Sequence, residues 1–258
     1  MNLINIDQFQ IIAFTFVFFR CLGFFLSWPI FSSNNMPSQL KVLLALMMAF
    51  ICFTLIEPSE YPKVMHYQSL IMLAAKEIII GFAMGFLCTF IFHAVSIAGE
   101  LISMAMGLSA AQIFNPTLGI QQSSVNQLYF FMAAFLFLGI RGHHYFITGL
   151  AQSFEMIPLS VLLPRMSELG EFSLIGQRIL QVGLLLSAPV MVSILLVNVC
   201  LGIVGRAVPQ INVLITSLPV NALMGLGVLM LMLPYFIDSL KTEITNFSEI
   251  MFGFLKVF

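Results

Sequence analysis

Charged side chains are scarce in this sequence of 258 residues. Asp, Glu, Lys and Arg together make up 8% of it and hydrophobic residues 60%, whereas about a quarter of the residues in a soluble domain are charged. This composition excludes an ordinary soluble domain and predicts a polytopic membrane protein in contact with lipid. The formal net charge of -1 lacks the basic excess typical of nucleic-acid binding, so we expect no nucleic-acid partner.

The sequence also lacks any cysteine pair at metal-ligand or redox spacing. Cys21, Cys52, Cys88 and Cys200 lie far apart in apolar runs, with no histidine at ligand spacing. We therefore expect buried hydrophobic cysteines, no metal site and no cofactor. The first residues, MNLINIDQFQ, lack the basic start of a cleavable signal peptide, which predicts a retained first helix.

Apolar blocks follow one another along the chain and predict a series of helices. Several blocks are longer than one membrane span requires, and others contain proline, which kinks or interrupts a helix. This pattern is unlike a bundle of upright spans and predicts bent helices that pack on protein. The blocks cover 9–30, 40–56, 69 to the central stretch, 128–140, 145–163, 174–204 and 213–237.

The central stretch from Ala98 to Ser124 joins two apolar blocks without being one. Its small residues leave little side-chain bulk, and Asn115-Pro116 favours a turn because proline restricts the residue before it. Non-helical backbone at membrane depth is tolerated only where it packs in protein or lines a water-filled cavity. Composition alone leaves two interpretations open: a re-entrant or pore-facing loop, and an ordinary connection outside the membrane.

Several charged residues lie in or beside apolar blocks. An unpaired charge is unfavourable there, whereas a paired one can fix the register between helices or subunits. We expect these residues to serve assembly, together with Gln210 at the end of the 174–204 block. Gly81 and Gly85 form a GxxxG spacing, which permits close helix contact. The charged residues are Arg20, Lys76, Glu77, Glu100 and Arg206.

Five segments, taken in order, resemble the FliR family of flagellar export-gate proteins, which has relatives in virulence type III secretion systems. They are FFRCLGFFLSWPIF with NNMP downstream, KEIIIGFAMGF, AGELISMAMGLSAAQIFNP, LGIRGHHYFI followed by SFEMIP, and LSAPVMVSILLVNVCLGIVGRAVPQINV. The ordered set covers most of the chain. The stretch GRAVPQIN after a proline-containing apolar helix makes the resemblance specific to this family. Two positions depart from the family pattern: Asn115 stands where many relatives have aspartate, and Arg141 where a small polar residue is common.

The resemblance implies an all-α membrane protein of bent, proline-broken helical hairpins. It implies a FliP-like part over 1–163, with a plug loop at about 107–124, then a linker over 164–173, a FliQ-like hairpin over 174–240 and an amphipathic tail over 241–258. It also implies assembly with FliP-like and FliQ-like subunits, and with other membrane proteins of the export apparatus. The resulting gate would lie in the flagellar basal body of the bacterial inner membrane and pass unfolded export substrates.

A gate that passes unfolded chains must hold back ions when idle. Methionine suits such a seal because its flexible, polarizable side chain repacks against irregular surfaces, and a ring of apolar side chains can dewet a narrow passage. Methionines that only fill a helix interface are the alternative. The candidates for the seal are Met104, Met106, Gly107, Phe114, Asn115 and Pro116.

Two other functions compete with an export gate. A secondary transporter would use Lys76, Glu77 and Glu100 as an ion pathway, but the sequence shows no convincing internal repeat. A hydrolase would need an activated serine, and Ser109 lies in no GxSxG pattern. The adjacent histidines at 143–144 are better explained as an interfacial turn, so we expect no catalytic residue.

Overall fold

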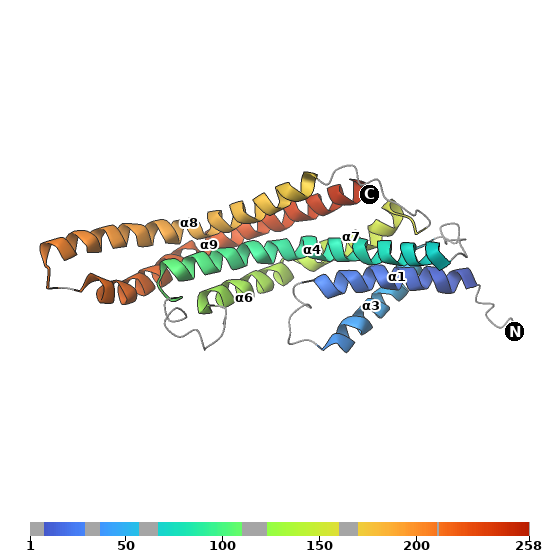
Figure 1. The fold of residues 1–258 in the computed structure, drawn as a ribbon, viewed down its shortest axis with the longest axis horizontal. Coiled ribbons are helices and arrows are strands. Elements are labelled where there is room, and N and C mark those ends of the chain that lie inside the picture. The colour runs from blue at the N-terminus through green and yellow to red at the C-terminus, as the bar shows by residue number, and fades with distance from the viewer. Residues whose placement is uncertain are drawn as a thin grey trace. The chain divides into compact units, whose positions relative to one another are not determined.

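The structure of the protein is a computed structural model that describes residues 8–28, 37–56, 67–109, 123–159, 170–210 and 212–257. Within these ranges all regular structure is α-helical (Figure 1), which confirms the predicted fold class. The helices are α1 (Gln8–Ser27), α3 (Ser38–Phe53), α4 (Tyr67–Ala105), α6 (Ser124–Gly139), α7 (Gly142–Met156), α8 (Gly170–Ala207) and α9 (Val213–Val257).

Four of these helices are long and apolar enough to cross a membrane. They are α1, α4, α8 and α9, and α6 with α7 supplies a fifth crossing if that bent pair counts as one span. With 16 residues, α3 is shorter than the roughly 20 residues that a hydrocarbon core requires. The fold is therefore that of a multi-pass membrane protein.

The last helix is longer than the apolar block that predicts it. α9 covers 45 residues and continues well past Ile237, where the block ends. The residues beyond that point are amphipathic and contain no proline, so no stop signal ends the helix there. Pro189 in α8, and Pro219 and Pro234 in α9, lie inside continuous helices, where each removes one backbone donor.

The chain divides into two compact units, which we describe separately. Unit 1 comprises Met1–Phe90, Arg141–Gly170 and Thr245–Phe258, and unit 2 comprises Ile91–Ile140 and Glu171–Ile244. These units do not test the predicted division into FliP-like and FliQ-like parts, which stays a prediction. Most of the predicted linker lies outside the described residues.

In unit 1, α1 and α4 approach closely because glycines stand where their backbones meet. A Cβ atom on Gly23 of α1 would lie 2.6 Å from the carbonyl oxygen of Ile78. From the α4 side, Gly81 lies against the backbone of Arg20, and Gly85 lies against a later turn of α1. Residues four apart share one face of a helix, so the two glycines of α4 form a continuous strip of contact.

In unit 2, helices α6 and α8 contact the second part of α4. A Cβ atom on Gly99 of α4 would lie 2.6 Å from the Cα atom of Asn126 in α6. A Cβ atom on Gly183 of α8 would lie 3.0 Å from the carbonyl oxygen of Ala94. Both contacts place backbone against backbone, as small residues do between membrane helices.

Helices α8 and α9 run side by side in unit 2 as a hairpin (Figure 1). The turn falls in the GRAVPQIN stretch, where the side chain of Asn212 accepts from the amide of Leu214 at 3.1 Å and so caps α9. Along the hairpin, Asn221 donates to Asn198 at 3.0 Å. A hydrogen bond between side-chain amides of two apolar helices favours one register of the pair.

Candidate functional site

Three charged side chains from the apolar blocks meet inside unit 1. The Nε atom of Arg20 donates to Oε2 of Glu77 at 2.5 Å, and Nζ of Lys76 lies 2.8 Å from Oε1 of Glu77. Arg20 and Glu77 are 0% exposed and Lys76 is 7% exposed. A lone charge at this depth would be strongly unfavourable, so the ionic cluster is stable only because its members satisfy one another.

Other donors of the ionic cluster bind backbone carbonyls at and just after the C-terminal end of α7. Arg20 donates to the carbonyl oxygens of Ser153 at 2.8 Å and Ile157 at 2.9 Å, and Lys76 donates to that of Pro158 at 3.2 Å. The last carbonyls of a helix carry the negative end of its dipole, so they favour cations. The helix ends here because Ile157 precedes a proline, which disfavours helical backbone.

Three of the sequence segments that carry the family resemblance converge on this cluster. Arg20 comes from FFRCLGFFLSWPIF, Lys76 and Glu77 from KEIIIGFAMGF, and the α7 carbonyls from SFEMIP. Arg20 and Ser153 are 133 positions apart in the sequence. The three segments therefore encode one packing arrangement of α1, α4 and α7.

The other two predicted assembly charges are placed differently. Glu100 is half-buried on α4, and Arg206 is exposed in the last turn of α8. Within the described ranges neither takes part in an ion pair. Gln210 is exposed in the turn that follows α8. In the described residues, the ionic cluster is therefore the site where Arg20, Lys76 and Glu77 pair with one another, and Glu100 and Arg206 are not part of it.

The C-terminal end of α4 forms one root of the central loop. The amide of Gly107 donates to the carbonyl of Met104, and that of Leu108 to the carbonyl of Ser103, both at 3.0 Å. These are the two bonds of a Schellman motif, in which the residue after the helix adopts the left-handed conformation. Gly107 has φ +77°, which glycine adopts without steric penalty, so this residue sets where the chain leaves α4.

The start of α6 forms the other root. The side chain of Ser123 accepts from the amide of Asn126 at 3.1 Å and caps the helix. The Asn126 side chain in turn accepts from Ser96 of α4 at 3.1 Å. A polar contact thus ties the first turn of α6 to α4. Residues 110–122 lie outside the described residues, among them Phe114, Asn115 and Pro116.

The two methionines at the end of α4 face different surroundings. Met104 is 53% exposed, whereas Met106 is 1% exposed. Leu108, just past the helix, is also exposed. The loop root therefore presents one methionine outward and holds the other inside unit 2.

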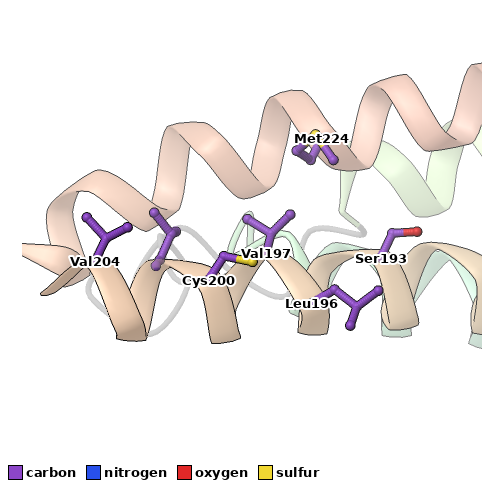
Figure 2. Close-up of a pocket in the computed structure, with 7 residues that line it drawn as sticks. Ser193, Leu196, Val197, Cys200, Val204 and Met224 are labelled. Atoms are coloured by element: carbon purple, nitrogen blue, oxygen red, sulfur yellow. The ribbon is translucent and has the colours of Figure 1, made fainter. Parts of the chain in front are cut away.

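An apolar groove of about 360 Å³ lies between α8 and α9 (Figure 2). Val197 extends from α8 toward the helix that carries Met224. Among the described residues that line it, Ser193 has the one hydroxyl and none carries a charge. In the part of the chain that the structure describes, no group of His, Cys, Asp or Glu could hold a metal ion. Apart from the Ser193 hydroxyl and the free thiol of Cys200, the groove offers apolar contact surface. Cys200 is exposed, so the expectation of buried cysteines is wrong for this residue and is confirmed for Cys21, Cys52 and Cys88.

Known proteins are similar to this chain over most of its length. The family model of bacterial export proteins, family 1, matches residues 11–247. The flagellar biosynthetic protein FliR of Bacillus subtilis is 33% identical over 220 residues, which cover 84% of this chain and 83% of that protein. The chain belongs to the FliR family.

Other FliR proteins match over comparable lengths. FliR of Aquifex aeolicus is 27% identical over 259 residues, covering 100% of this chain and 99% of that protein. FliR of Escherichia coli is 28% identical over 230 residues, covering 88% and 87%. Family membership and the four apolar helices make this chain a multi-pass inner-membrane component of the flagellar export apparatus, located at the basal body.

Sequence reasoning about this FliR-family chain missed some of the contacts described above. It did not single out Gly23, although the spacing of Gly23 and Ser27 in α1 is a small-residue pattern of the kind found in GxxxG. It also missed the α7 carbonyls, because backbone acceptors leave no signal in residue type. The roles proposed for the individual site residues stay predictions.

Proposed function

We propose that this chain is a core subunit of the protein-conducting export gate, assembled with FliP-like and FliQ-like subunits and in contact with other membrane proteins of the apparatus. The observation that carries the proposal is the bare apolar surface of the α8–α9 hairpin. In the most apolar stretch of each of these helices only 22% of residues are buried within the chain, against 61% in α4. Such a surface needs cover from neighbouring subunits or from lipid.

The position of the charges favours subunits as part of that cover. Arg206 ends the apolar α8 and is exposed, and Glu100 is half-buried on α4. Charges in or beside membrane spans usually face protein or water and pair there. We assign to both residues ion pairs with partner chains, with Gln210 as a neighbouring polar contact. The ionic cluster of Arg20, Lys76 and Glu77 holds unit 1 together for that assembly.

The division into parts follows from the same proposal. The α8–α9 hairpin is the FliQ-like part over 174–240, and residues 1–163 form the FliP-like part. The Asn198–Asn221 contact and the ion pair between Arg178 and Glu243, at 2.6 Å, support the hairpin as a structural element of its own.

The central loop seals the gate when it is idle and moves aside for unfolded export substrates. Exposed Met104 at its root supplies a flexible apolar side chain, and Phe114, Asn115 and Pro116 complete the sealing segment. A passage lined by such side chains dewets and blocks ions without a rigid lid. The function requires no catalytic group, metal or cofactor from this chain.

Deletion of residues 114–119 tests the seal. We expect the assembled gate to form in normal amount and to leak ions across the membrane, measured as conductance against the wild-type gate at equal abundance. An unchanged conductance in a fully assembled deletion variant would contradict the seal.

The transporter alternative has weaker support. Lys76 and Glu77 are bound within the ionic cluster and nearly or fully buried, whereas an ion pathway needs groups that exchange ions with water. Gradient-driven solute uptake by the purified chain alone would favour the transporter over the gate.

A further inference from the structure

Met106 occupies the space that a side chain at position 225 would need. A Cβ atom on Gly225 of α9 would lie 2.6 Å from Cγ, 2.7 Å from Sδ and 2.8 Å from Cε of Met106. These three atoms make up most of the methionine side chain, so a methyl group at position 225 would displace it as a whole. Met106 is 1% exposed, which leaves it little room to move elsewhere.

A second contact joins the same two helices. A Cβ atom on Gly107 would lie 2.7 Å from Cδ2 of Leu218. Leu218 and Gly225 are seven residues apart on α9, which places them on one face two turns apart. One face of α9 therefore holds two consecutive residues at the point where the chain leaves α4.

We propose that Gly225 forms a notch on α9 that seats Met106 and thereby fixes the root of the central loop. Met106 is then a positioning residue, and exposed Met104 is the methionine available to the seal. The inference rests on the proposed sealing function, because the notch matters to the gate only if the position of the loop root does. It assigns to the α8–α9 hairpin a second role, as the support of the loop.

The chemistry of methionine suits this seat. Its unbranched thioether adapts to an irregular gap and packs against backbone without a polar group to satisfy. Glycine is disfavoured in the interior of a helix relative to alanine, so its presence at position 225 has a physical reason in this contact. Gly227 provides a matched control, because a Cβ atom there would meet nothing within 4 Å.

Disulfide trapping tests the geometry independently of the seal. In the full chain within the assembled gate, with Cys21, Cys52, Cys88 and Cys200 replaced by alanine, we compare Met106→Cys/Gly225→Cys with Met106→Cys/Gly227→Cys. Added diamide accepts the two protons and two electrons that the thiols release. A disulfide forms when Cβ atoms lie about 3.5–4.5 Å apart, so we expect cross-linking only in the first pair. Equal cross-linking in both pairs, or in neither, would overturn the notch.

Ion conductance tests the role of the notch. Overpacking of this kind shifts the ratio of seated to unseated Met106 by a factor of roughly 5 to 150, so we expect Gly225→Ala to leak and Gly227→Ala to behave as wild type. Met106→Ala empties the notch from the other side and should also leak. The double variant Gly225→Ala/Met106→Ala should leak no more than the worse single variant, because both changes act on one contact.

The two proposals fail in different ways. A tight gate after deletion of 114–119 overturns the seal and with it any role of the notch in sealing, while the cross-link still decides the contact. A leaking deletion variant, combined with equal conductance of Gly225→Ala and Gly227→Ala in fully assembled gates, overturns the notch alone. If Gly225→Ala assembles poorly, Met106→Ala supplies the same comparison: a tight gate in that variant overturns the notch.

Discussion

Arg20 and Glu77 form a fully buried ion pair across the closest approach of α1 and α4, with 2.5 Å between Nε and Oε2. Four residues after Glu77, Gly81 lies against the backbone of Arg20 itself. The pair and the glycine contact depend on each other. The glycine lets the backbones meet, and the short distance lets the guanidinium bind both Glu77 and the end of α7.

The charge balance of the ionic cluster predicts which of two substitutions destabilises the complex more. Glu77→Leu leaves two buried cations side by side without their carboxylate, and removing one partner of a buried pair costs about 3–5 kcal/mol. Arg20→Met leaves Lys76 paired with Glu77, so we expect a smaller loss. Heat-induced unfolding of the detergent-purified complex measures both. Equal stability of the two variants, or the reverse order, would contradict the described cluster.

Alanine substitution should have opposite effects at two helical glycines. Gly81→Ala drives a methyl group into the Arg20 backbone, and overpacking of this kind costs about 1–3 kcal/mol. Gly176 in α8 meets nothing within 4 Å, so alanine there gains about 0.5–1 kcal/mol from its better helix propensity. Unfolding midpoints of the two variants should lie on either side of wild type, and a shift in the same direction argues against the close α1–α4 packing.

Arg141 is the one non-glycine residue with positive φ among the described residues, at +58°. Left-handed backbone is unfavourable for an L-residue with a Cβ atom, and the exposed Arg141 side chain does not offset this by burial. Arg141→Gly should therefore raise the stability of the complex by about 0.5–1 kcal/mol, because the relief of left-handed strain exceeds the entropic cost of glycine. The control is Arg141→Ala, which removes the charge and keeps the Cβ atom. A gain of equal size in both variants would assign the effect to charge and not to backbone strain.

The two charges that form no ion pair within the described ranges should decide assembly. Arg206→Ala and Glu100→Ala each remove a group that we assign to a partner chain, and truncating one member of a buried interface charge pair weakens binding by roughly tenfold or more. Detergent pull-down of FliP-like and FliQ-like chains by the tagged protein measures the loss. Arg206→Lys keeps the charge and should retain more partner. Full recovery of partners by both alanine variants contradicts the assignment.

Helix positions and family membership follow from the sequence because apolar length and ordered motifs are local signals. The 9–30 block gives α1 within a few residues, and the uninterrupted run from 69 gives α4. Contacts between residues that are far apart in the sequence cannot be predicted in this way. Nothing in residue type joins Arg20 to the carbonyl of Ser153, and nothing in the sequence separates Gly225, which seats Met106, from Gly227, which faces open space.

The two methionines at the loop root also show that burial by a distant helix cannot be predicted from the sequence. Met104 and Met106 lie two positions apart on a helix, so they point to different faces. Which face is buried depends on where α9 packs. The sequence therefore predicts both methionines as candidates for the seal. Only the packing of the helices shows that Met104 is exposed and Met106 is buried.

The most direct test of the account is affinity purification of the tagged full-length chain from membranes that also contain FliP-like and FliQ-like proteins. The account predicts that both partners co-purify as one stable complex, because the bare α8–α9 surface needs their cover. It also predicts that the chain made without them aggregates or is degraded. A stable, monodisperse chain that purifies alone when both partners are present would contradict it.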